Sequence, residues 1–91
     1  DKTENVKFTT AERGQVIVEN KTDKKCTVKF KGQNYELEAG ATKVFMNLNV
    51  YNKIYDIDIY VNGKRIEKLY NGMLTCSQKK ITFTLNPEDI K

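Results

Sequence analysis

The clearest alternation of hydrophobic and polar residues lies between positions 54 and 61. Four apolar or aromatic residues there would share one face: Tyr55, Ile57, Ile59 and Val61. A period of two over eight residues is typical of a β-strand with one buried face. Asn62-Gly63 follows, and this pair favours a two-residue hairpin because a type I′ turn needs positive φ at both central positions. We therefore predict a hairpin whose second arm runs over residues 64–70.

Shorter runs of the same kind fill the rest of the chain. They predict strands at 6–10, 15–19, 26–30, 35–37, 43–48, 73–76 and 81–85. In the run at 43–48, Val44, Met46 and Leu48 are expected on one face of the strand and Phe45 on the other. Closely spaced turn signals are typical of β-sandwiches and small barrels. The prediction is one domain over residues 1–91, a small antiparallel β-sandwich of about eight short strands.

Residues 14–45 carry a recognisable order of turns between their strands. Asn20-Lys21-Thr22 forms one turn, and Glu38-Ala39-Gly40 forms a later one. This order resembles the opening half of many secreted immunoglobulin-like modules and covers about a third of the chain. The resemblance implies an immunoglobulin-like fold and no particular activity. The chain departs from that pattern because it has no Trp, whereas true immunoglobulin domains bury one.

The two cysteines bear on both stability and location. A domain this small has a thin stability margin unless something staples it. A disulfide between Cys26 and Cys76 would stabilise it by about 4 kcal/mol. The alternative is two unrelated thiols in a cytosolic protein, and we favour the disulfide. Together with the glycosylation sequon at Asn20-Lys21-Thr22, it leads us to expect a secreted protein.

The chain lacks the usual residues of catalysis and cofactor binding. It contains no His, and its five glycines are isolated, so Ser-His and Cys-His nucleophiles, zinc sites and phosphate loops are not expected. We predict a protein that is not an enzyme and has no cofactor. A two-residue hairpin loop would set Asp58 opposite Glu67 near Asp56, a weak candidate Ca²⁺ site. A three-residue loop would instead pair Asp58 with Lys68, and ordinary solvated charges are the favoured interpretation.

Tyr60 and Arg65 are the strongest candidates for contact with a partner. Both are expected on the outer face of the hairpin, and Tyr and Arg are common in interface hot spots. The first hypothesis is a secreted, non-enzymatic module that binds another protein or a cell-surface macromolecule, as an inhibitor or as part of a surface protein. No apolar run is long enough to span a membrane, and the sequence does not indicate an oligomeric state.

The alternative hypothesis rests on the net charge of +4 and the pI of about 9.1. A basic domain could bind an anionic polymer, either a glycan or a nucleic acid. The residues expected to do so are Lys29, Lys31, Lys64, Arg65 and Lys68. Nucleic acid is not favoured, because Arg suits phosphate and guanine better than Lys does, and the chain is poor in Arg.

Overall fold

The computed structural model describes residues 13–67 and 70–90, so the strand predicted at 6–10 lies outside the described residues. Eight strands and a final turn of 3₁₀ helix make up the described part of the chain. They are β1 (Arg13–Asn20), β2 (Cys26–Phe30), β3 (Gln33–Leu37), β4 (Thr42–Asn49), β5 (Lys53–Val61), β6 (Lys64–Arg65), β7 (Tyr70–Leu74), β8 (Lys80–Leu85) and η1 (Pro87–Ile90).

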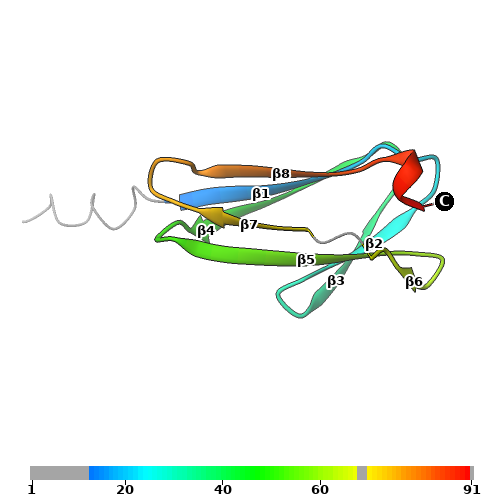
Figure 1. Cartoon of the computed structure of the whole chain (residues 1–91), viewed down its shortest axis with the longest axis horizontal. Coiled ribbons are helices and arrows are strands. Elements are labelled where there is room, and N and C mark those ends of the chain that lie inside the picture. The colour runs from blue at the N-terminus through cyan, green and yellow to red at the C-terminus, as the bar shows by residue number, and fades with distance from the viewer. Residues whose placement is uncertain (1–12, 68–69, 91) are drawn as a thin grey trace, which may run out of the picture.

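The strands form two sheets that pack face to face (Figure 1). Sheet A has the order β4-β1-β8, and sheet B has the order β3-β2-β5-β6, with β7 pairing another stretch of β5. This confirms the predicted all-β sandwich. The prediction of a purely antiparallel sandwich is wrong, because β1 and β8 are parallel. Parallel neighbours need a long crossover connection, and here the whole of sheet B lies in the chain between them.

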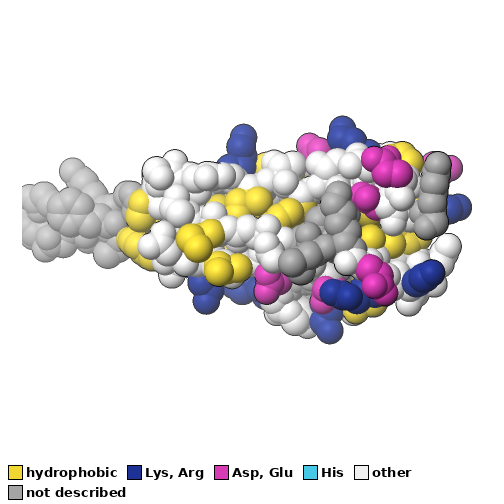
Figure 2. Space-filling model, viewed as in Figure 1, with side chains coloured by type: hydrophobic (Ala, Val, Ile, Leu, Met, Phe, Trp, Pro, Cys, Tyr) yellow, Lys and Arg dark blue, Asp and Glu magenta, His cyan; other side chains and the backbone are white. Residues whose placement is uncertain are grey.

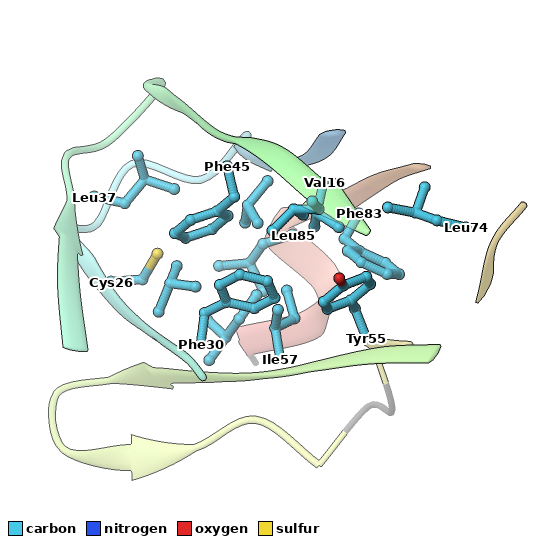
Figure 3. Packing of buried hydrophobic residues seen from close by; sticks show 14 of the residues in the cluster. Val16, Cys26, Phe30, Leu37, Phe45, Tyr55, Ile57, Leu74, Phe83 and Leu85 are labelled. Carbon is cyan, nitrogen blue, oxygen red and sulfur yellow. The ribbon is translucent and has the colours of Figure 1, made fainter. Parts of the chain in front are cut away.

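Aromatic rings join the two sheets at the centre of the core. Phe45 of β4 lies on Phe30 of β2 with 4.3 Å between ring centroids, and Tyr55 of β5 is 5.8 Å from Phe30 (Figure 3). The predicted inner face of β5 is confirmed, since Tyr55, Ile57, Ile59 and Val61 are all buried. The Tyr55 hydroxyl remains satisfied in the core because it hydrogen-bonds the backbone N–H and C=O of Asn49.

The predicted facing of β4 is wrong, and a β-bulge is the reason. Phe45 and Leu48 are buried, whereas Val44 and Met46 are exposed. Gly14 pairs with Leu48 and Val16 with Phe45, so β4 uses three steps where β1 uses two. Asn47 supplies the extra residue with a φ of 61°, a left-handed conformation that Asn tolerates better than most residues. The bulge therefore turns two residues three apart toward the same core.

The predicted hairpin turn is confirmed, but its second arm is shorter than expected. Asn62 and Gly63 have φ values of 55° and 78°, and Tyr60 pairs with Arg65. Strand β6 ends at Arg65, Ile66 N–H still donates to the Ile59 carbonyl of β5, and Tyr70 returns in β7 opposite Ile57. Asn71-Gly72 lies inside β7 rather than in a turn. A Cβ on Gly72 would lie 2.9 Å from Ile81 Cδ1, so this glycine permits close packing of β7 on β8.

A buried amide closes the end of the sandwich where β1 and β8 finish. Asn20 is 1% exposed. Its Nδ2 donates hydrogen bonds to the carbonyls of Lys24, Leu37 and Glu38 at 2.8, 3.4 and 3.2 Å. Its Oδ1 accepts from the N–H and the hydroxyl of Thr22 at 3.0 and 2.7 Å. One side chain therefore connects the end of β1, the loop before β2 and the end of β3.

The same geometry bears on the sequon. Glycosylation attaches to Nδ2, and in the folded chain this atom is buried and faces backbone carbonyls. Asn20 and Thr22 therefore have a structural role as a hydrogen-bonded turn. The sequon no longer supports secretion, because a glycan on Asn20 would have to displace all three carbonyl contacts.

Replacing Asn47 tests the bulge. Val tolerates the left-handed conformation poorly, so Asn47→Val is expected to lower the free energy of unfolding by about 1–2 kcal/mol. Asn47→Gly should leave it unchanged or slightly raised. Urea unfolding measures both, with Met46→Val as the control on the neighbouring exposed position. An Asn47→Val protein as stable as wild type would contradict the bulge.

Replacing Asn20 tests the buried turn. Asn20→Ala leaves the Thr22 N–H and three carbonyls without this partner, so the free energy of unfolding should fall by about 3 kcal/mol. Asn71→Ala, at an exposed position of β7, is the control and should change it by less than about 0.5 kcal/mol. Equal urea midpoints for the two variants would show that the Asn20 hydrogen bonds contribute little.

Candidate binding surface

The outer face of sheet B collects the side chains that alternate with the core residues of β5 and β2. Strand register sets Tyr60 between Thr27 of β2 and Arg65 of β6. Two residues away along β5, Asp58 lies opposite Lys29 of β2, which in turn pairs with Asn34 of β3. Aromatic, basic and amide side chains therefore meet on adjacent strands at the hairpin end of this face.

A shallow hollow of about 280 Å³ lies within this group. Its lining residues are Thr27, Lys29, Asn34, Tyr60 and Gly63. The Thr27 hydroxyl already donates to the Glu36 carboxylate at 3.1 Å. Within residues 13–67 and 70–90, the polar ends of Lys29 and Tyr60 have no hydrogen bond or ion pair. The hollow thus offers one cation and one phenol hydroxyl to a ligand, beside a half-buried ring.

Arg65 and Asp58 form an ion pair with 3.3 Å between Nε and Oδ1. The predicted Tyr60–Arg65 pairing is confirmed, but the guanidinium is held by Asp58 rather than left free. The loop has two residues, yet β6 ends at Arg65, so no strand pairing sets Glu67 opposite Asp58. Asp56 instead pairs with Asn71 of β7. The described residues contain no group of three metal-ligating side chains.

The predicted basic residues do not form one patch. Lys29 lines the outer hollow. Lys31 lies near the other face of the sheet, with Nζ 6.0 Å from the centroid of the buried Tyr55 ring. Lys64 and Arg65 line a separate cleft at the end of the molecule. Lys68 lies outside the described residues.

The cleft at the hairpin end is the larger hollow, about 630 Å³ in volume. It lies between the β5–β6 hairpin, the loop before β2 and η1, and it includes Lys24, Glu67, Glu88 and Ile90. The alternation of hydrophobic and polar residues does not predict this cleft, because its far wall is η1. Asn86-Pro87 is a typical helix-start signal in the sequence, but such a signal does not indicate what the turn packs against.

The opposite end of the outer face of sheet B is apolar. Ile54 and Met73 are register neighbours on β5 and β7, and they are 57% and 44% exposed. Tyr51, in the loop before β5, is 62% exposed. Figure 2 shows hydrophobic side chains exposed along β7 and the adjoining end of β5. The pair was not predicted from the sequence, because the strand expected at 73–76 begins three residues later than β7 and had no assigned partner strand.

Cys26 and Cys76 are free thiols in the structure, so the predicted disulfide is absent. Cys26 begins β2, beyond the Asn20 end of β1. Cys76 precedes β8, whose start pairs with Gln15 at the other end of β1. The six residues of β8 separate these ends by roughly 16 Å, whereas bridged Cα atoms lie within about 7 Å. The prediction of the disulfide failed because the spacing of residues along the chain does not show which strand ends lie close together.

The two thiols differ in environment. Burial raises the pKa of the Cys26 thiol to about 11, and the neighbouring Glu36 carboxylate adds to the rise. Cys76 is exposed in the connection between β7 and β8. Only the thiolate is a strong nucleophile, so Cys26 is doubly protected by burial and by its raised pKa.

No protein-family model, curated protein or solved structure matches this chain. Among the described residues, no helix has the length and apolar character needed to cross a membrane. Functional interpretation therefore rests on the two hollows, the exposed apolar pair and their charges.

Thiol labelling tests the arrangement of the cysteines. At pH 8, Cys76 in the native protein should react with iodoacetamide within minutes, while Cys26 should react only after denaturant is added. Intact-mass measurement counts the adducts, and Cys76→Ser should abolish the rapid one. A native protein in which neither thiol reacts until a reductant is added would contradict the free-thiol arrangement.

Burial of Cys26 also predicts a dependence of stability on pH. The thiol pKa is raised from 9.0 to about 11 in the folded chain. The unfolded chain therefore releases this proton first, and the contribution to stability, fully present below pH 9, is lost as the pH rises from 9 to 11. Cys26→Ala should flatten that decline in urea unfolding, whereas Cys76→Ser should not. Equal slopes for wild type and Cys26→Ala would contradict it.

Proposed function

We propose that this chain is a non-enzymatic recognition module that binds another protein through the outer face of sheet B, with Tyr60 at the centre of the contact. The observation that carries the proposal is the hollow beside Tyr60, in which Lys29 has no partner among the described residues. Tyr is enriched in interface hot spots, and the unpaired cation offers a charge to an acidic group of a partner.

The rest of the face supports the same proposal. Ile54 and Met73 expose apolar surface. Burying this surface against a partner would stabilise the complex by about 25 cal/mol per Å². The Arg65–Asp58 ion pair lies between this apolar end and the free end of the hairpin. Exposed pairs of this kind contribute little energy and more to orientation. The face therefore combines anchors with a polar surround, as protein interfaces do.

Binding to an anionic polymer is less well supported. Polyanion binding requires several cations that can contact phosphates or sulfates together. Here Lys29, Lys31 and Lys64 lie in three different surroundings, and Arg65 is paired with Asp58. Secretion is not part of the proposal, because its two supports were a disulfide and an accessible sequon.

Peptide display with a matched tyrosine control tests this function. A random 12-residue library is selected on immobilised full-length chain, and the tightest peptides are measured by calorimetry. Tyr60→Ala should weaken binding by about 30-fold, the effect of a typical hot spot. Tyr51→Ala removes a more exposed ring that lies outside the hollow and should change affinity less than about threefold. Lys29→Glu, at an exposed position, is a second probe of the hollow.

Two outcomes would contradict the proposal. Peptides that bind the Tyr60→Ala and Lys29→Glu variants as tightly as wild type would show that the contact lies elsewhere. Binding that falls by orders of magnitude between about 50 and about 200 mM salt would indicate recognition of an anionic polymer instead. Urea unfolding of each variant, compared with wild type, separates lost contacts from lost folding.

A further inference from the structure

We propose that the cleft at the hairpin end is a second binding site, which takes a short extended peptide carrying an apolar side chain between a basic and an acidic one. The site is formed by the β5–β6 hairpin, the loop before β2 and η1. The inference does not depend on Tyr60, whose hollow lies on the outer face of sheet B. It is based on the floor, the walls and the free strand edge of the cleft.

The floor of the cleft is apolar and continuous with the core. Val61 is 7% exposed, and Ile66 and Ile90 are half-buried against the core cluster. In Figure 2 a strip of hydrophobic surface at this end of the molecule lies between acidic side chains. A volume of about 630 Å³ is within the range of sites that enclose small ligands, about 300–1,000 Å³.

The walls are fixed by hydrogen bonds to backbone N–H groups. Ile66 N–H donates to the Ile59 carbonyl at 2.8 Å, which holds the chain in place after β6. On the other wall, the Asp89 carboxylate accepts from Asn86 N–H at 2.8 Å and caps η1. Such preorganised walls lower the entropy cost of binding a ligand.

Four charged side chains of the cleft have no hydrogen bond or ion pair within the part of the chain that the structure describes. Two are acidic and two are basic: Glu67, Glu88, Lys24 and Lys64. Arg65 is held by Asp58. A ligand of one sign would meet repulsion from half of this set, whereas a ligand bearing both signs can pair with all of it.

The strand edge favours a peptide over other ligands with both charges. β6 ends the order β3-β2-β5-β6, and among the described strands only β5 pairs with it. Its outer edge lines the cleft. Because backbone groups alternate along a strand and Ile66 N–H points to Ile59, it is Arg65 whose N–H and C=O face outward to an added strand. An extended segment could hydrogen-bond this edge while its apolar side chain covers Ile66 and Ile90.

Titration with four blocked peptides tests the proposal. Their central residues are Lys-Leu-Glu, Lys-Leu-Lys, Glu-Leu-Glu and Lys-Gly-Glu, each flanked by glycines. They are added to ¹⁵N-labelled full-length chain and followed by amide chemical shifts. The Lys-Leu-Glu peptide should shift the amides of Ile66, Glu67 and Ile90 and bind tightest. Losing the leucine should weaken binding by about tenfold, and making both flanks alike by several-fold.

A charge-reversal variant supplies the matched control. Glu67→Lys with Glu88→Lys should weaken Lys-Leu-Glu binding by about tenfold and make Glu-Leu-Glu the preferred peptide. Glu38→Lys, at an exposed turn outside the cleft, changes net charge without touching the site and should leave the order of affinities unchanged. Because all three glutamates are exposed, folding should survive each change.

Three results would overturn the proposal. The first is the absence of cleft shifts with Lys-Leu-Glu at about 10 mM, a concentration well above a weak Kd of about 1 mM. The second is an unchanged preference in the charge-reversal variant. The third is a set of shifts confined to Thr27, Lys29 and Tyr60, which would place peptide binding on the surface proposed above and leave the end cleft without a ligand of this class.

Discussion

The side-chain amide of Asn20 is the interaction on which most of the structure depends. It is buried where the end of β1, the loop before β2 and the end of β3 meet. Backbone hydrogen bonds hold the same end together: Asn20 N–H donates to the Ala41 carbonyl, and Lys21 N–H donates to the Leu85 carbonyl. Leaving a buried amide unpaired destabilises the fold by more free energy than the paired amide contributes. This cluster of hydrogen bonds therefore forms completely or the end opens. It joins the sheets without a disulfide, and it positions β2 and Lys24 for the two hollows.

Local chemistry was sufficient to predict the hairpin. Alternation gave the inner face of β5, and Asn62-Gly63 gave the turn, because both depend only on neighbouring residues. The same rules failed at Asn47 and at Asn71-Gly72. Asn47 forms a bulge, so that Phe45 and Leu48 share the core. Asn71-Gly72 lies inside β7, where Gly72 packs against Ile81. In both places packing between the sheets overrides a local preference.

The candidate surfaces were predictable only in part. Tyr60 and Arg65 are opposite each other across the turn, so hairpin register alone brings them together. The hollow also needs Lys29 and Asn34, which requires the pairing of β2 with both β3 and β5. Ile54 and Met73 meet only once β7 is in register, and η1 forms a wall of the end cleft only after β8 is in place. Long-range pairings of this kind have no signal in a single sequence.

Hydrogen exchange at the Asn20 side chain tests the central claim most directly. In the described structure, Asn20 Nδ2–H₂ is buried and donates to carbonyls of the loop before β2 and of the end of β3. Its two protons should therefore exchange with solvent only when the whole domain unfolds, with the free energy of opening equal to that of global unfolding. The exposed amide of Asn71 gives the reference for free exchange in the same spectrum. If the Asn20 protons exchanged as fast as those of Asn71, the amide would not hold the two sheets together.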